Sequence, residues 1–95
     1  MTEAPDPGGL LAFFEARQGA IVRDLETLVV GESPSSDAVA VTALAEWVRA
    51  RLVAARVPAE RVPFDGRGDG VLARLGPERG GTLLLGHLDT VWPVG

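Results

Sequence analysis

Apolar residues recur at intervals of three, four and seven positions in the first third of the chain. This spacing places them on one face of a helix. Gly19 weakens the middle of that helix by up to ~1 kcal/mol relative to alanine, but the pattern continues through it to Gly31, which is expected to end it. Residues 1–9, which contain two prolines and two glycines, are expected to be a flexible amino terminus. The stripe consists of Leu10, Phe13, Phe14, Ile21, Leu25, Leu28 and Val29.

A second apolar stripe predicts a second helix, which Pro58 closes. The loop before it, residues 32–37, supplies serine and aspartate side chains that can accept hydrogen bonds from the first helical turn. Both helices are apolar on one side, so each needs a sheet or other helices to cover it. The second stripe consists of Val41, Leu44, Ala45, Val48, Leu52 and Ala55.

From Arg61 onward the period changes from 3.6 residues to two, which is typical of strands. We expect a short strand around Val62, a turn over residues 65–70 and a second strand over residues 71–75. Residues 82–85 form a continuous apolar run, as expected of a central strand buried on both faces. The predicted fold class is therefore α/β, with two amino-terminal helices followed by three short strands.

A buried central strand needs neighbours on both edges and helices over both faces. The residues after this strand are too few to supply them, and the last five are mostly apolar. We therefore expect residues 10–95 to be the amino-terminal part of a larger, incomplete α/β domain.

The composition of the chain excludes several kinds of partner and of functional site. The 95 residues carry a net charge of −4, which argues against a nucleic acid or an anionic membrane as partner. No cysteine is present, which excludes a disulfide scaffold, an iron–sulfur cluster and a thiol nucleophile, and the single histidine excludes a self-contained site of several imidazoles. The sequence shows no secretion signal and no apolar run near the ~20 residues of a membrane span, so we expect a cytoplasmic protein.

The candidate chemistry lies directly after the third predicted strand, where Gly86 is followed by His87, one spacer and Asp89. Ligand-binding groups gather beyond the carboxyl ends of strands in open α/β sheets. Imidazole is a common zinc ligand, and a ligating histidine usually hydrogen-bonds a carboxylate that fixes its tautomer. His87 is thus a candidate metal ligand with Asp89 as its partner. The alternative is a structural His87, with Asp89 starting a turn.

Two other sequence features are weaker candidates for a functional site. Residues 67–69 read Arg-Gly-Asp, but a turn between strands explains them better than an adhesion ligand. Ser33 and Ser35 lack the GxSxG context of a nucleophile, so we expect them to serve capping and loop geometry.

The string LLLGHLDTVWPVG resembles the first zinc-ligand motif of the co-catalytic zinc metallopeptidases of metallopeptidase family twenty. That family includes carboxypeptidase G-type glutamate carboxypeptidase, aminoacylase, acetylornithine deacetylase and succinyl-diaminopimelate desuccinylase. The ESPS loop at residues 32–35 and the order of helices and strands look similar too, so the resemblance extends from Leu10 to Gly95. Of the branches, the carboxypeptidase G type looks most similar.

The resemblance implies an α/β/α catalytic domain of the zinc-peptidase type. It implies His87 as a ligand of one of two zinc ions, for which cobalt or manganese could substitute, and Asp89 as a catalytic residue that orients His87. It further implies hydrolysis of an amide bond in a small peptide or N-acyl amino acid, and a homodimer formed through a downstream domain. The other ligands and the general base would lie downstream, so we expect the 95-residue chain alone to be inactive and to bind zinc weakly.

Two alternatives to this enzyme stay open. One is a truncated, non-catalytic relative that acts as an interaction protein. The other is an unrelated small α/β domain in which His87 and Asp89 are structural.

Overall fold

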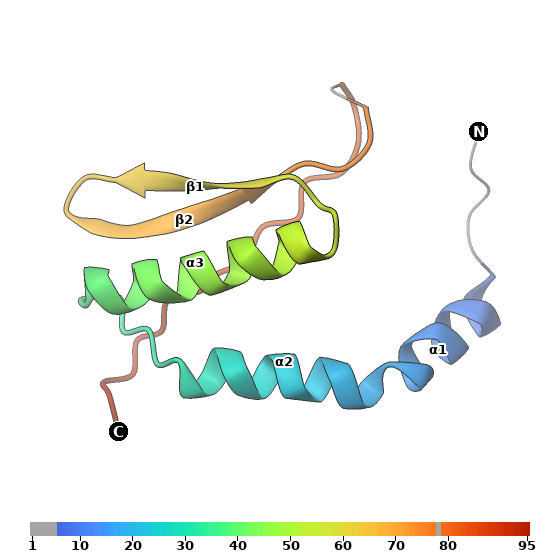
Figure 1. Ribbon diagram of the computed structural model, residues 1–95, viewed down its shortest axis with the longest axis horizontal. Coiled ribbons are helices and arrows are strands. Elements are labelled where there is room, and N and C mark those ends of the chain that lie inside the picture. The colour runs from blue at the N-terminus through green and yellow to red at the C-terminus, as the bar shows by residue number, and fades with distance from the viewer. Residues whose placement is uncertain (1–5, 78) are drawn as a thin grey trace. The chain divides into compact units, whose positions relative to one another are not determined.

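The computed structural model describes residues 6–77 and 79–95. The chain divides into two compact units, residues 1–30 and residues 31–95. Within the described ranges the elements are three helices and two strands, so the fold class is α/β (Figure 1). No helix in these ranges is long and apolar enough to cross a membrane.

The first unit contains two helices where the sequence predicts one, α1 (Pro7–Ala16) and α2 (Gln18–Val30). The break falls at Arg17, not at Gly19. The Arg17 side chain donates a 2.9 Å hydrogen bond to the carbonyl of Phe13 and lies 3.5 Å from the centre of its ring. The Arg17 backbone N–H turns to Phe14 instead. The helical bond between residues 13 and 17 is thereby replaced, and α1 ends.

The amino-terminal end of α1 lies earlier than the sequence pattern suggests. Asp6 accepts a 3.0 Å hydrogen bond from the backbone of Gly9 and so caps the helix, and Pro7 takes the first helical position, which proline favours. Of the segment expected to be flexible, residues 7–9 are helical, and residues 1–5 lie outside the described ranges.

The second unit begins with α3 (Ala38–Ala54), close to its predicted position. The Asp37 carboxylate accepts a 3.0 Å hydrogen bond from the backbone of Ala40, so the expected cap is this aspartate. At the other end Arg56 adopts a left-handed conformation, with φ +65°, before Pro58. The predicted termination ahead of Pro58 is therefore confirmed.

Two antiparallel strands, β1 (Ala59–Phe64) and β2 (Arg67–Ala73), follow α3 and form a hairpin. Val62 pairs with Gly70 and Phe64 with Arg67, with an irregularity between Val62 and Phe64, at the proline that cannot donate to the ladder. The turn predicted over residues 65–70 is wrong in extent. Asp65 and Gly66 suffice, because Gly66 takes φ +69°, and β2 starts at Arg67.

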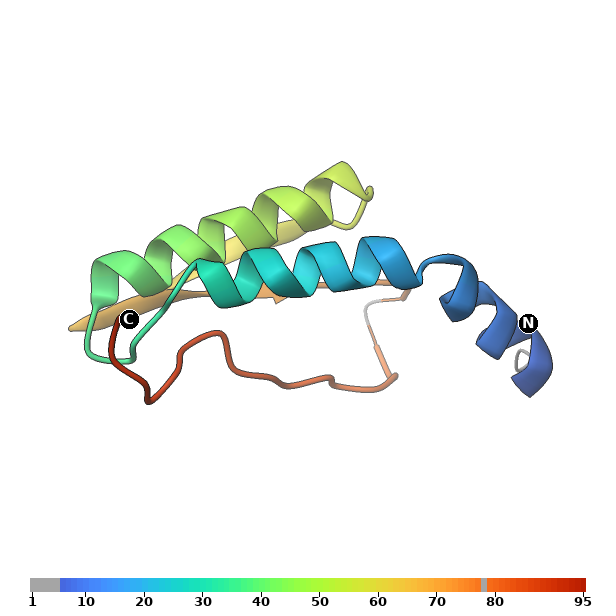
Figure 2. The same cartoon turned by 90° about the horizontal axis from the view of Figure 1, so that it is seen from below.

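Helix α3 lies along one face of the hairpin (Figures 1 and 2). Its buried apolar residues, Val41, Leu44 and Ala45, are the first half of the predicted stripe. The close approach depends on Gly68 of β2, because a Cβ there would come within 2.4 Å of Val41 Cβ. A glycine at this position is therefore a packing requirement of the unit.

Polar contacts add to this packing. Glu46 of α3 lies 2.6 Å from Arg49 and 3.7 Å from Arg61 of β1, and Arg61 lies 3.6 Å from Asp69 of β2. The hydrogen bond from Arg49 is the main cause that lowers the pKa of Glu46. These ion pairs link α3 to β1 and β1 to β2.

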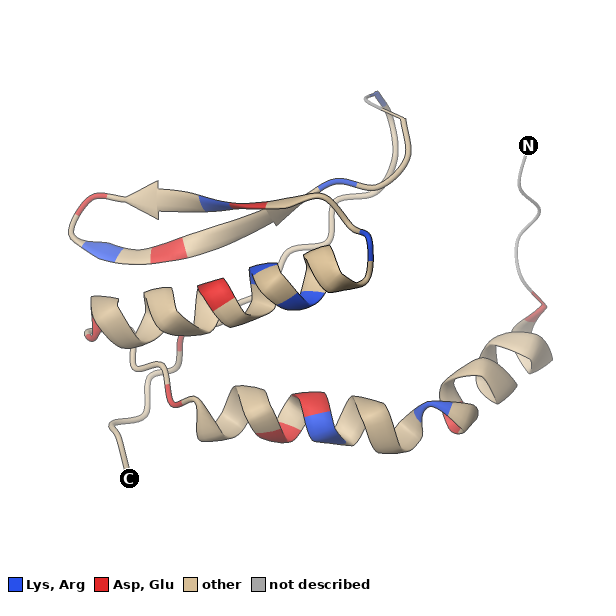
Figure 3. Cartoon of the chain, viewed as in Figure 1, with Lys and Arg blue, Asp and Glu red and all other residues tan. Residues whose placement is uncertain are grey.

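The third predicted strand is absent from the described residues. Residues 82–85 are a coil, and Leu83, Leu84 and Leu85 are 79%, 90% and 88% exposed. Because no described strand lies beside them, their backbone groups have no ladder partner, and an apolar run alone does not make a strand. The coil runs back toward the start of α3 (Figure 2), and Asp89 is its only charged residue between Gly80 and Gly95 (Figure 3).

Candidate functional site

The candidate site is built where the carboxyl-terminal coil meets the loop before α3. The Thr90 backbone N–H donates to the Ser33 carbonyl at 2.8 Å, and the Ser35 N–H donates to the Thr90 carbonyl at 2.8 Å. These two bonds form an isolated parallel bridge between Pro34 and Thr90. The ESPS loop and the His-x-Asp segment, far apart in the sequence, are therefore side by side.

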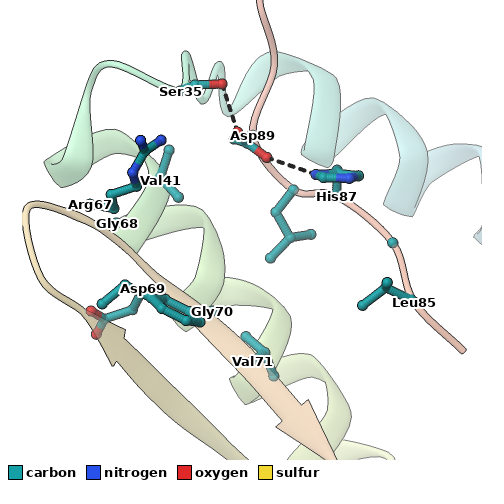
Figure 4. Close-up of a pocket in the computed structure, with 13 residues that line it drawn as sticks. Ser35, Val41, Arg67, Gly68, Asp69, Gly70, Val71, Leu85, His87 and Asp89 are labelled. Carbon is teal, nitrogen blue, oxygen red and sulfur yellow. Dashed lines mark hydrogen bonds and ion pairs between the residues drawn. The ribbon is translucent and has the colours of Figure 1, made fainter. Parts of the chain in front are cut away.

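Asp89 is the centre of this contact. Its Oδ2 accepts a 2.6 Å hydrogen bond from the Ser35 hydroxyl, and its Oδ1 lies 3.3 Å from His87 Nδ1 (Figure 4). An ionised carboxylate can only accept, so a hydrogen bond between Asp89 and a neutral His87 requires the proton on Nδ1. The other ring nitrogen, Nε2, is then unprotonated and is able to bind a metal ion.

Hydrogen bonds hold Asp89 in its ionised form. The bond from Ser35 is the largest cause that lowers the pKa of Asp89, and the contact with His87 acts in the same direction. Partial burial opposes them, since the Asp89 side chain is only 38% exposed, whereas that of His87 is 87% exposed. The pair thus combines a held carboxylate with an accessible imidazole.

A cavity of about 440 Å³ adjoins the pair, between the coil, β2 and the start of α3. Both His87 and Asp89 line it, with Ser35 beside them (Figure 4). A volume of this size is typical of small-molecule sites. Its apolar lining comes from all three elements and from β1: Val41, Phe64, Val71, Leu85 and Leu88.

The contact between His87 and Asp89 agrees with their spacing in the sequence, whereas the hydrogen bonds of Ser33 and Ser35 to this segment were not expected. Ser35 does not cap α3, since Asp37 does so, and bonds Asp89 instead. Ser33 is 1% exposed, and its hydroxyl donates a 2.5 Å hydrogen bond to the Leu88 carbonyl. The resemblance of the ESPS loop was the only signal in the sequence that connected these residues with the motif.

The Arg-Gly-Asp tripeptide lies in β2 and not at the tip of a turn. The backbone N–H of Asp69 donates to the Thr42 hydroxyl at 2.9 Å, and its carboxylate lies 3.6 Å from Arg61. An adhesion ligand presents this aspartate freely, whereas here it is held against α3 and β1. The structure therefore gives no support to the adhesion reading.

The potential metal-binding atoms of the pair are few. His87 offers one nitrogen, but Asp89 already uses one oxygen for Ser35 and the other for His87. Among residues 6–77 and 79–95, no three histidine or acidic side chains gather closely enough to hold a metal ion. Since a zinc site takes at least three protein ligands, the described residues do not form a complete zinc site.

Comparison of the chain with protein-family models, curated proteins and solved structures gives no match.

Proposed function

We propose that this chain is the amino-terminal part of a metal-dependent hydrolase that cleaves an amide bond in a small peptide or N-acyl amino acid. One observation carries the proposal. Asp89 Oδ1 lies 3.3 Å from His87 Nδ1, which leaves Nε2 as the free, metal-binding nitrogen of an exposed imidazole. Carboxylate–histidine pairs of this kind orient ligands in zinc enzymes.

The surroundings of the pair support the same reading. His87 and Asp89 line a 440 Å³ cavity whose other walls are largely apolar, and such cavities accommodate small ligands. The resemblance of the motif to metallopeptidase family twenty gives the reaction class. In that family the catalytic domain is α/β/α, and we propose the same architecture for the complete domain here.

The exposed apolar residues of the coil support a larger domain. Leu83, Leu84 and Leu85 have between 79% and 90% of their surface accessible, although such a run is typical of a buried strand. Further chain that pairs with residues 82–85 would bury these leucines and supply the remaining ligands.

In this proposal each residue has a defined role. His87 would hold the metal through Nε2, and Asp89 would keep the imidazole in the required tautomer and raise its basicity. A bound zinc ion, or cobalt or manganese in its place, supplies a Lewis acid and lowers the pKa of a bound water. Two ions and a homodimer are implied by the resemblance and, like the cytoplasmic location, remain predictions.

The test uses the full polypeptide that the gene encodes. We expect it to hydrolyse N-acyl amino acids or dipeptides, to lose this activity with a chelator, and to regain it when zinc is added. His87→Ala should abolish the activity, whereas Arg79→Ala, a substitution on the same coil, should not. Activity that survives both chelation and His87→Ala would show that this is an unrelated α/β protein. A polypeptide without activity in any metal would favour the non-catalytic relative.

A further inference from the structure

The coil that carries His87 is held by hydrogen bonds to the loop before α3. Hydrogen bonds join the coil, within residues 79–95, to residues 32–35 of the loop. They connect Ser33 with Leu88 and Thr90, Ser35 with Asp89 and Thr90, and Glu32 with Gly95. This loop therefore fixes the position of the candidate site.

Within the loop, Ser35 makes the contact that bears on chemistry. Its hydroxyl has a single hydrogen and two acceptors in reach, Asp89 Oδ2 at 2.6 Å and the Thr90 carbonyl at 3.0 Å. The shorter contact is to a carboxylate, and hydrogen bonds to charged acceptors are the stronger ones. The Ser35 hydroxyl therefore donates its hydrogen bond to Asp89.

Ser35 is itself held firmly in this orientation. Its backbone N–H bonds the Thr90 carbonyl at 2.8 Å, and the preceding Pro34 is buried. Ser33, one residue further back, is almost fully buried and bonded on both its hydroxyl and its carbonyl. A rigid donor on Oδ2 limits rotation of the Asp89 carboxyl group, so Oδ1 remains directed at His87 Nδ1.

We propose that Ser35 is a positioning residue: by fixing the carboxylate of Asp89, it holds His87 in the tautomer that presents Nε2 to a ligand. The inference rests on the proposed function for its purpose, but the arrangement of hydrogen bonds does not require a metal. Ser35 touches neither metal nor substrate in this proposal, and it acts through Asp89.

The test measures the tautomer directly by ¹⁵N NMR of the 95-residue chain, with the imidazole neutral and no metal present. Because His87 is the only histidine, its two ring nitrogens give an unambiguous signal. We expect the Nδ1–H form to dominate in the natural chain. The matched variants are Ser35→Thr and Ser35→Val, which have nearly the same shape and differ by a hydroxyl.

Ser35→Thr should keep the tautomer ratio, and Ser35→Val should reduce the ratio of Nδ1–H to Nε2–H by about fivefold, as expected for the loss of one hydrogen bond. Ser36→Ala, an exposed neighbour, should leave it unchanged. Backbone amide shifts of α3 identify any variant that has lost its fold. If Val destabilises the loop, Ser35→Ala removes the same hydroxyl without added bulk and should shift the ratio similarly.

An equal ratio in the Thr and Val variants, or a natural chain without a preferred tautomer, would overturn the proposal. These outcomes are distinguishable from failure of the proposed function, because the tautomer is read without metal or substrate. A tautomer that depends on Ser35 in a polypeptide without hydrolytic activity would refute only the hydrolase.

Discussion

The Ser35 hydroxyl donates a 2.6 Å hydrogen bond to Asp89 Oδ2 across 54 residues of sequence. Asp89 in turn faces the imidazole of His87 at 3.3 Å. A loop between two helices therefore sets the arrangement of a site whose named residues lie near the other end of the chain. The electrostatic consequence is a lowered pKa for Asp89.

This pKa predicts how the contact depends on pH. A carboxyl group whose pKa is lower in the folded than in the unfolded chain stabilises the fold at pH above its ordinary pKa of about 4. That stabilisation is lost as the pH falls through the lower pKa of the folded chain. Ser35→Ala removes the largest cause and should raise the pKa of Asp89 toward its ordinary value. A ¹³C NMR titration of the Asp89 carboxyl group measures this pKa in the natural chain and in the Ser35→Ala variant.

Ser36→Ala is the control for this titration, because Ser36 is exposed and bonds neither oxygen of Asp89. The same pKa of Asp89 in the Ser35 and Ser36 variants would contradict the assigned contact.

Gly68→Ala should destabilise the second unit by about 1–3 kcal/mol, the usual cost of forcing extra volume into packed structure. The added Cβ would lie 2.4 Å from Val41 Cβ and 3.1 Å from the Ala38 carbonyl, both part of α3. Gly86→Ala is the matched control, since an added Cβ there meets no atom within 4 Å. Urea denaturation measures the difference, and equal losses in the two variants would be inconsistent with the described packing of α3 on β2.

Asp37→Ala should cost about 1 kcal/mol in the free energy of unfolding, because the Ala40 N–H at the start of α3 loses its acceptor. Asp37→Asn keeps a side-chain oxygen at the cap and should retain most of the stability. Thermal unfolding followed by circular dichroism compares the two, and a full loss in the asparagine variant would speak against capping as the cause.

Zinc should bind the 95-residue chain orders of magnitude more weakly than a structural site with four ligands, because the described residues supply one imidazole and no cluster of three ligands. Isothermal titration calorimetry at neutral pH measures the affinity, and His87→Ala should remove what binding there is. Tight, stoichiometric uptake by this chain would mean that the ligand set has been misread.

Features of the second unit that depend on neighbouring residues were predictable from the sequence. Residues 38–54 form a helix because an aspartate stands at its start and apolar residues follow with helical spacing. The proximity of His87 and Asp89 also follows from local sequence, since a single residue separates them. Short-range hydrogen bonds and helical periodicity decide these features.

The predictions from the sequence were wrong or incomplete where residues far apart in the chain, or a single side chain, decide the structure. The stripe continues past Arg17, but α1 ends there, and the Arg17 side chain bonds the Phe13 carbonyl. The run at 82–85 has the composition of a central strand, and pairing depends on a neighbour that periodicity cannot reveal. The bond between Ser35 and Asp89 joins a loop to a coil far along the chain, which no local pattern encodes.

The proposed binding of a metal ion by His87 Nε2 is measured most directly as the zinc content of the full polypeptide encoded by the gene. Elemental analysis should find bound zinc in the natural protein, a stoichiometry lower by about one ion per chain in His87→Ala, and no loss in Arg79→Ala. Equal zinc content in the natural and His87→Ala proteins, both folded, would contradict the assignment of His87 as a ligand.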